Sequence, residues 1–511
     1  MTFYSILFER PEDDPGEATG RDAPAYFADL NLDQVIDEVI TGFEEYDLAP
    51  FFYAPLASVR AVVYRQEVLR ELEGDRPSEC IRAFTRKMQT MRRYLELADR
   101  LRHPYQKRRW FLDAVRVYCD AVDHLSRELS SLKPASRGLS ALCDHLTTYT
   151  RSSEFTGLVG DVEVLTRRCA GVNYCISIDG GTVTVLPCDS EADLGAEVEV
   201  ALARFRQGAV EDHLVVFDDR PEMTHVEERI LDLVAMLYPD VFRELDVFQD
   251  AHAGFLDPTI ARFDREVQFY RAYLAFISRF RETGLQFCIP RVSGTSREVC
   301  SRDCFDLALA MRLLEKRAPI VCNDFALKDP ERIFIITGPN QGGKTTFARA
   351  FGQMHHLAGL GCSVPGREAR LFLFDRLFTH FEQKETIDNL QSGLENDLLR
   401  IHSILAECTP SSIVIINEIF SSTTVRDALF LGQRVLEQVA KLDMIAVCVT
   451  FLDELATLDK TVSLVSTVDP EYPERRTFRI ERRPADGLSF ALAIAKKHRL
   501  THRDLLERIP P

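Results

Sequence analysis

Apolar residues recur at helical spacing along the first half of the chain. Between residues 56 and 72 they follow one another at steps of three or four residues or their sums, and Gly74 marks a stop. A longer stripe runs through residues 259–281, where the apolar positions advance by 3, 4, 3, 4 and 3 residues. This pattern predicts a helical region with one long helix, which is either a rigid strut or an ordinary buried helix of a bundle.

A β pattern interrupts the helical region and then replaces it. Two alternating runs flank Gly180-Gly181, which predicts a small β-hairpin near residues 175–186. Beyond Pro290, short β-rich apolar runs alternate with helical stretches, as is typical of an α/β domain with a mostly parallel sheet. These runs are 333–336, 413–416 and 444–449.

Length and composition indicate a multidomain protein. The 511 residues exceed the usual size of one domain, and 46% hydrophobic with 28% charged residues is ordinary globular composition. The first 50 residues differ, because they hold 13 acidic and two basic side chains. We predict a solvated acidic N-terminal arm over residues 1–48, a helical core and lever domain with the hairpin over 49–290, and an α/β domain over 291–511.

Charge and cysteine content narrow the classes of partner and compartment. The net charge of −17 disfavours nucleic-acid binding over the whole surface but leaves a local basic patch open. The 13 cysteines form no C-x-x-C pair, which disfavours a disulfide framework or a zinc ribbon. The start of the chain lacks a basic leader, and no apolar run reaches about 18 residues. We therefore predict a cytoplasmic protein without a membrane partner.

One motif carries strong chemical information. The run 333–336 leads through Thr337 into Gly338-Pro339-Asn340-Gln341-Gly342-Gly343-Lys344-Thr345-Thr346, which matches G-x-x-x-x-G-K-[ST] between a strand and a helix. The glycines let backbone amides face phosphate oxygens, and the start of the helix adds partial positive charge. Lys344 reaches the β- and γ-phosphates, and the Thr345 hydroxyl can bind Mg²⁺. The motif therefore predicts a P-loop with all nine residues at a nucleotide.

A second strand supplies a candidate catalytic acid. The run 413–416 ends in Asn417-Glu418, where a P-loop hydrolase normally has a carboxylate beside Mg²⁺ and then the glutamate that activates water. Glu418 fits the catalytic base. Asn417 takes the metal position with an amide oxygen, which is a weaker partner than a carboxylate. We predict weaker Mg²⁺ binding or slow turnover, with nucleotide binding retained.

Several segments together resemble the MutS family of DNA mismatch-repair ATPases. The segment 337–346 is similar to that family's T-G-P-N-M-G-G-K-S-T loop. Residues 361–365 and 373–379 resemble its G-x-x-V-P and L-F-D-R-I-F-T segments. Asn323-Asp324 stands where the family has N-D before the first ATPase strand, and residues 65–69 resemble the R-Q-[DE]-A-V that opens its helical core.

The resemblance is strong over residues 318–500 and looser over 50–290. It implies a mainly helical core and lever region followed by an α/β P-loop ATPase domain of the ABC-like type. The chain lacks an N-terminal F-x-E motif of the kind that wedges into a mismatch. We therefore expect a short, divergent member without the N-terminal mismatch-recognition domain.

The resemblance also assigns roles to single residues. It implies that Asn340 lies beside ATP and that Ser392, in Gln391-Ser392, matches the signature serine that reaches the ATP of the partner subunit. Residues 423–427 resemble the family's T-S-T-x-D loop at the dimer seam. A homodimer with two composite sites for ATP and Mg²⁺ is therefore implied. The alternative for Ser392 is a helix cap ahead of Leu394.

Three departures from the family surround the expected γ-phosphate. Asn417 replaces aspartate, Phe-Ser-Ser at 420–422 replaces G-R-G, and Phe451 stands where the family has its γ-phosphate-sensing histidine. Because all three changes fall around one phosphate, we expect slow hydrolysis.

A basic segment is the candidate surface for nucleic acid. Residues 82–109 hold ten Lys or Arg and two acidic residues, which gives a net charge of +8. Such a patch can neutralise phosphates without reading sequence. The candidate DNA contacts are Arg92, Arg93, Lys107, Arg108 and Arg109. The alternative is a solvated helix face whose charges pair with the acidic N-terminal arm.

We predict an ATP-dependent DNA-binding protein of the MutS type and a slow ATPase. ATP binding would close a homodimer and clamp double-stranded or branched DNA in repair or recombination. The alternative is a nucleotide-gated protein-interaction scaffold with little turnover and no DNA target, which Asn417, Phe451 and the acidic composition favour. A small-molecule kinase has less support, because nothing beyond the P-loop suggests an acceptor site.

Overall fold

The structure is a computed structural model that describes residues 3–14, 16, 22–188, 223–381, 393–472 and 475–485. The chain divides into two compact units, each discontinuous in sequence. The helical unit consists mainly of Gly74–Ala135 and Ser140–Asp264, and the α/β unit of Phe3–Glu73, Ser136–Leu139 and Arg265–Pro511. Within the described ranges, no helix combines the length and the apolar character that a membrane span requires.

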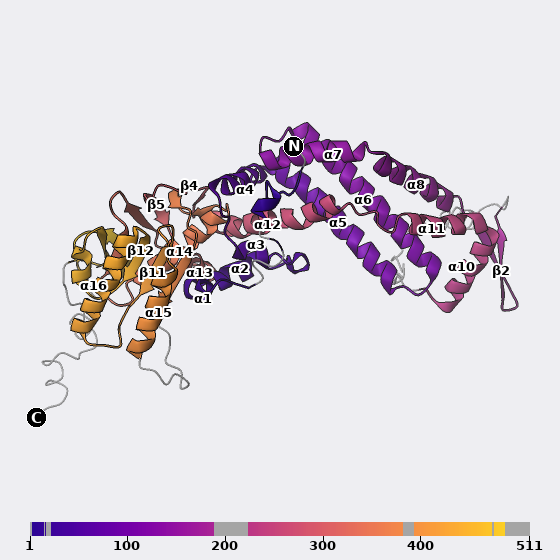
Figure 1. The fold of residues 1–511 in the computed structure, drawn as a ribbon. Helices are drawn as coiled ribbons and strands as arrows, with labels where there is room; N and C mark the ends of the chain where they lie inside the picture. The colour runs from indigo at the N-terminus through magenta and orange to yellow at the C-terminus, as the bar shows by residue number, and fades with distance from the viewer. Residues whose placement is uncertain are drawn as a thin grey trace, which may run out of the picture. The chain divides into compact units, whose positions relative to one another are not determined.

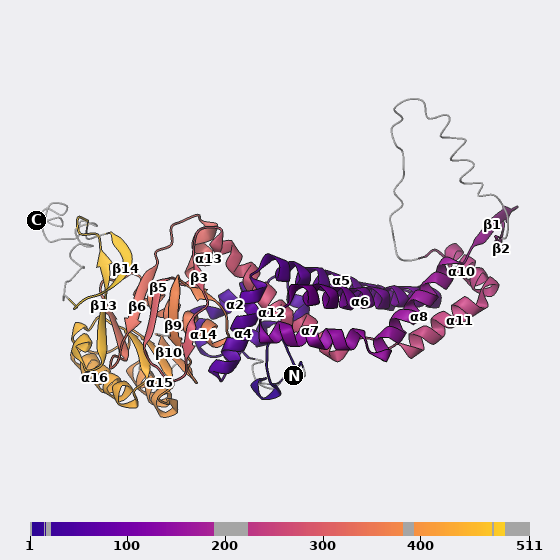
Figure 2. The ribbon, with the colours of Figure 1, turned by 90° about the horizontal axis from the view of Figure 1, so that it is seen from above.

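The helical unit is built on two long neighbouring helices and a small hairpin. Its elements are α5 (Asp75–Arg100), α6 (Pro104–Leu132), most of α7 (Arg137–Thr150), α8 (Ser153–Ala170), β1 (Tyr174–Asp179), β2 (Thr182–Pro187), α10 (His225–Leu237), α11 (Pro239–Ala251) and the first part of α12 (Pro258–Arg281). Helices α5 and α6 lie side by side in both ribbon views (Figures 1 and 2). Helices α8 and α11 pack on α6, and the hairpin lies beside α10.

Local sequence explains where these elements begin and turn. The Ser152 side chain accepts a hydrogen bond from the Phe155 amide and starts α8. Thr224 and Glu227 form a reciprocal capping box at the start of α10. In the hairpin, Gly180 and Gly181 both have positive φ, which a two-residue turn between twisted strands requires.

The α/β unit combines helices with most of the strands of the described chain. Its helices are α1 (Tyr26–Leu30), α2 (Leu32–Ile40), α3 (Ala49–Tyr53), α4 (Val59–Leu72), the end of α12, α13 (Leu307–Glu315), α14 (Lys344–Gly359), α15 (Gly393–Glu407) and α16 (Val425–Leu442). Its strands are β3 (Phe287–Cys288), β4 (Arg291–Ser293), β5 (Val299–Cys304), β6 (Asn323–Leu327), β7 (Ile333–Thr337), β8 (Val364–Pro365), β9 (Glu368–Phe372), β10 (Leu377–Phe381), β11 (Ile413–Asn417), β12 (Ile445–Val449), β13 (Thr461–Val468) and β14 (Arg476–Arg482).

The main sheet has the order β10-β11-β12-β7-β13-β14, and only β14 pairs antiparallel. Alternate residues of β7 face opposite sides. Ile333 and Ile335 join a core with α15 and α16, which lie together in Figure 2. Phe334 packs instead against Phe347 and Phe351 of α14. Helices therefore cover both faces, and the carboxyl ends of β7, β11 and β12 meet at one edge of the sheet.

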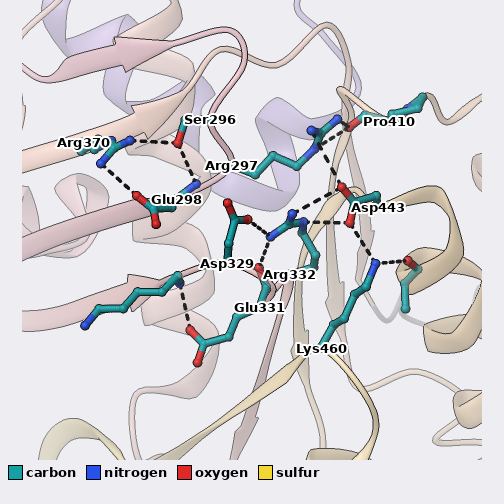
Figure 3. Close-up of polar contacts among 12 residues, drawn as sticks. Ser296, Arg297, Glu298, Asp329, Glu331, Arg332, Arg370, Pro410, Asp443 and Lys460 are labelled. Carbon is teal, nitrogen blue, oxygen red and sulfur yellow. Dashed lines mark hydrogen bonds and ion pairs between the residues drawn. The ribbon is translucent and has the colours of Figure 1, made fainter.

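A polar cluster secures the opposite ends of these strands (Figure 3). Arg332 precedes β7, Asp443 precedes β12 and Lys460 precedes β13. The Arg332 guanidinium and the Lys460 ammonium donate to Asp443 Oδ1 over 3.0 and 2.9 Å. Burial alone would raise the pKa of the Asp443 carboxyl, but the hydrogen bonds from Lys460 and Arg332 outweigh it and lower the pKa. One carboxylate thus links the amino-terminal ends of three parallel strands.

The N-terminal segment is not the solvated arm that its charge predicts over residues 1–48. Ile6 and Leu7 are fully buried, and α2 has a buried apolar face. Helix α1 lies against α14, where Gln353 Nε2 donates to the Leu30 carbonyl over 2.8 Å. The Arg65 guanidinium donates to the carbonyls of Leu7 and Leu360 over 3.0 and 3.3 Å. A count of acidic residues did not predict this packing, because the helices of the segment are amphipathic and their buried apolar faces do not affect the count.

Asp29 of α1 offers a test of this packing. Its Oδ2 accepts hydrogen bonds from the Thr379 hydroxyl at 2.6 Å and from Arg400 at 3.4 Å. We expect Asp29→Ala to lower the free energy of unfolding by about 1–3 kcal/mol, because two polar partners lose their acceptor. Urea unfolding of the α/β unit measures this change. The matched control Asp37→Ala, on the exposed side of α2, should shift it by less than about 0.5 kcal/mol. Equal losses in both variants would contradict the docked arrangement.

Candidate functional site

The glycine-rich turn lies between β7 and α14, at the carboxyl edge of the sheet. Gly338 and Gly343 have φ of +116° and +91°, in the left-handed region that favours glycine. A Cβ at Gly338 would lie 2.8 Å from the Ser466 carbonyl oxygen, and one at Gly342 would lie 2.2 Å from Ser466 Oγ. The Ser466 hydroxyl donates to the Gly342 carbonyl over 2.7 Å. Ser466 of β13 therefore leaves no room for a side chain at Gly338 or Gly342.

Lys344 is the first residue of α14, and its side chain folds back into the turn. The Nζ atom donates to the carbonyls of Gly338 and Pro339 over 2.9 and 3.2 Å. The same atom lies 4.2 Å from the ring centroid of Phe451. Burial lowers the pKa of the Lys344 ammonium, against the opposing effect of the nearby Glu418 carboxylate. The turn thus holds a buried cation at a helix N-terminus.

Thr345, the second residue of α14, connects this helix to β11. The Thr345 hydroxyl donates to Asn417 Oδ1 over 2.8 Å. Glu418 follows with φ of +59°, and its amide donates to the Val449 carbonyl over 2.9 Å. These contacts bring the predicted metal-binding residues Thr345 and Asn417 together, with the predicted base directly after them.

The other predicted site residues have different environments. Asn340 and Gln341 are exposed, and Pro339 and Thr346 are partly or fully buried beside the turn. Ser392 lies outside the described residues, so its predicted role and its alternative as a cap stay predictions. In the segment 423–427, the Thr424 side chain caps α16 by accepting a hydrogen bond from the Asp427 amide over 3.2 Å.

An aromatic cavity beside the turn was not anticipated from the sequence. Its volume is about 240 Å³, and Gly343 and Thr346 form part of its wall. Its apolar lining includes Leu313, Ile320, Phe347 and Phe478.

Phe478 owes its place in this cavity to an unusual backbone conformation. Its φ is +58°, and Asn323 Nδ2 donates to its carbonyl over 3.2 Å. The amide of Ile480 in turn donates to Asn323 Oδ1 over 2.8 Å. Asn323-Asp324 was the only sequence signal for this contact. Phe478 and the cavity as a whole do not belong to a contiguous motif.

The basic segment of the helical unit is largely neutralised. Arg92 pairs with Asp264, and Arg108 pairs with Asp246. Arg109 pairs with Asp113 over 2.9 Å. Arg93 is exposed and Lys107 half-buried, and neither forms an ion pair with a described residue. Three of the five candidate DNA contacts therefore pair with carboxylates, and these carboxylates belong to the helical unit and not to the acidic arm that the alternative named.

Comparison with known proteins matches the region that carries the turn. The family model of MutS domain V matches residues 334–498. Residues 334–498 are therefore similar to domain V of MutS proteins. The DNA mismatch repair protein MutS of Halalkalibacterium halodurans is 32% identical over 149 residues, which are 29% of this chain and 17% of that protein.

A second MutS protein matches with a similar identity and over a similar length. The DNA mismatch repair protein MutS of an Exiguobacterium species is 30% identical over 160 residues, or 31% of this chain and 19% of that protein. The matched part thus spans less than a fifth of either relative. The MutS-like part of the chain contains the glycine-rich turn, Asn417, Glu418 and Phe451.

Helix α14 also buries two adjacent histidines. His355 and His356 are fully buried, and they hydrogen-bond the carbonyls of Phe351 and Phe52, each over 2.8 Å. Burial lowers the pKa of each imidazole to about 4 from its usual 6.5. Among the described residues there is no cluster of three or more metal-ligating side chains. The histidines are therefore packing residues.

These histidines make stability depend on pH. As the pH falls below about 6.5, the two imidazoles become protonated in the unfolded chain. In the folded chain they stay neutral until about pH 4. The part of the free energy of unfolding that depends on the neutral imidazoles is therefore complete above pH 6.5 and is lost between pH 6.5 and 4. We expect His355→Phe to reduce the acid sensitivity of the urea midpoint between pH 7 and 5. An unchanged acid sensitivity in the variant would contradict this origin.

Proposed function

We propose that this chain is an ATP-dependent protein of the MutS type. It binds ATP with Mg²⁺ at a P-loop formed by the glycine-rich turn, and ATP binding closes a homodimer that clamps DNA. The observation that carries the proposal is the buried Lys344 ammonium in a glycine turn at the start of α14. The MutS domain V match and the names of both relatives support a role of the DNA mismatch-repair type.

The residues of the turn suit a polyphosphate. Amides of a glycine turn and the N-terminus of α14 attract anionic oxygens, and Lys344 adds a full charge. The aromatic cavity beside Gly343 suits the base, because Phe347 and Phe478 offer rings against which a flat heterocycle can pack. In this proposal the base and the phosphates lie on opposite sides of Gly343.

The site also has groups for a slow hydrolysis. When bound with the nucleotide, Mg²⁺ would neutralise phosphate charge, and Thr345 and Asn417 would hold it through neutral oxygens. Their hydroxyl and amide oxygens lie side by side, which fits a metal that takes most of its ligands from phosphate and water. Glu418 would accept the proton of the attacking water. Turnover is slow in this proposal because Asn417 contributes no charge.

A homodimer and a DNA contact complete the proposal. Val425 lies within the segment 423–427 that resembles the dimer seam, and Phe430 follows it on α16; the two are 73% and 57% exposed. Exposed apolar side chains of this size suit a protein partner, here a second copy of the chain. For DNA we assign Arg93 and Lys107, because the other three predicted cations already face carboxylates.

The alternative of a nucleotide-gated protein scaffold without a DNA target has one specific observation in its favour. Arg92, Arg108 and Arg109 all form ion pairs within the helical unit. Pairing lowers the positive potential that would attract phosphates. The two proposals share the nucleotide site and differ only in the output.

ATP hydrolysis with and without duplex DNA tests the main proposal. We expect slow hydrolysis by the full chain that DNA stimulates, and a loss of at least about tenfold in Lys344→Ala, because the phosphates lose their cation. Glu418→Gln, which keeps the shape of the base, should lose hydrolysis and keep ATP binding. Hydrolysis equal in the wild type and Lys344→Ala would contradict the assignment of the site.

Filter binding of duplex DNA at low and high salt distinguishes the two outputs. We expect the double variant Arg93→Glu, Lys107→Glu to lose most low-salt retention, because it reverses the two unpaired cations. The control with the same change of charge is Arg127→Glu together with Lys133→Glu. Arg127 lies near the end of α6, where it pairs with Asp123, and Lys133 follows the helix. Retention that is absent in the wild type, or equally reduced by both pairs of changes, would favour the scaffold.

A further inference from the structure

Phe451 is an exposed aromatic residue that covers the cation of the turn. Its side chain is 51% exposed, and its ring centroid lies 4.2 Å from Lys344 Nζ. The preceding residue is fixed, because Thr450 is buried and its amide donates to the Ile336 carbonyl over 3.0 Å. The ring thus extends from a rigid strand end into the space in front of the turn.

We infer that Phe451 is a gate on this site. Its ring and the turn carbonyls together hold Lys344 in a phosphate-free position, and the ring must leave the ammonium before Lys344 can pair with a nucleotide phosphate. The inference rests on the proposed function, because it concerns the binding of nucleotide at the same turn.

The coordination of the ammonium explains why the two states compete. A lysine ammonium has three N–H donors. Two of them serve the carbonyls of Gly338 and Pro339, and the remaining side faces the aromatic ring. A phosphate oxygen therefore has to replace at least one of these partners, and the ring is the one that is free to swing into solvent.

The strengths of the contacts decide which state wins when nucleotide is present. A cation–π contact at a half-exposed site is worth about 1 kcal/mol, which is roughly fivefold in an equilibrium constant. A charge-assisted hydrogen bond from an ammonium to phosphate is stronger than the ring contact it replaces. The gate thus weakens nucleotide binding modestly without abolishing it.

The gate also predicts which nucleotides are accepted. A ligand gains from opening the gate only if it brings phosphate to Lys344, which in a P-loop is the β- and γ-phosphate. A nucleoside monophosphate would have to open the gate without that gain. We therefore assign the site to nucleoside di- and triphosphates.

The test compares dissociation constants by isothermal titration of the full chain with ADP, AMP and a non-hydrolysable ATP analogue. We expect Phe451→Leu to bind ADP and the analogue roughly three- to tenfold more tightly, because leucine offers no ring face to the ammonium. Phe451→Tyr keeps a ring and should bind as the wild type does. Tyr472→Leu is the matched control, because Arg475 lies 4.6 Å from that exposed ring, outside the turn.

The outcomes separate the gate from the site itself. Tighter binding by Phe451→Leu, with the control unchanged, supports the gate. Unchanged or weaker binding by Phe451→Leu, while the wild type binds ADP, overturns the gate and leaves the proposed function standing. Binding of neither ADP nor the analogue by the wild type overturns both. If Phe451→Leu fails to fold, Phe451→Met gives the same comparison, because methionine is also apolar and ringless.

Discussion

A buried lysine ammonium at the start of a helix is the interaction on which the α/β unit depends. Lys344 is only 5% exposed, yet it has no carboxylate within its own turn and relies on two carbonyls and a ring. A buried charge is costly unless polar partners compensate it. The glycines permit the turn that supplies those carbonyls. Ser466 of β13 packs against the turn and donates a hydrogen bond to the Gly342 carbonyl.

The rest of the unit keeps this edge of the sheet in order. Asp443 links β7, β12 and β13 at their amino-terminal ends. The carboxyl ends of β7 and β12 lead into the turn and Phe451, and Asn417 ends the neighbouring strand β11. Helix α14 is fixed along its length by neutral contacts, including Gln353 with α1 and the buried His356 with Phe52. A rigid frame around one strained turn is what a site for a charged ligand needs, because little has to reorganise when the ligand binds.

Sequence patterns predicted the local parts of this arrangement well. The apolar runs and the glycine motif placed β7, β11, β12 and the start of α14, because those signals are contiguous in the chain. Thr345 and Asn417, each assigned to Mg²⁺ from the sequence, lie within hydrogen-bonding distance, and their metal-binding role stays a prediction.

Non-local features could not be predicted in the same way. The acidic N-terminal segment packs on α14 because its helices gather apolar residues on one side, which a charge count does not register. The arginines of the basic segment find carboxylates far away in sequence, such as Asp264 for Arg92. Phe478 reaches the cavity through a left-handed backbone conformation that a bulky residue rarely adopts, so no propensity would indicate it.

Equilibrium dialysis of labelled ATP against the full chain, with and without Mg²⁺, is the most direct test of the central claim. The account predicts saturable binding of one ATP per chain that excess unlabelled ADP displaces and excess AMP does not. Absence of saturable binding, or displacement by AMP as readily as by ADP, would contradict it.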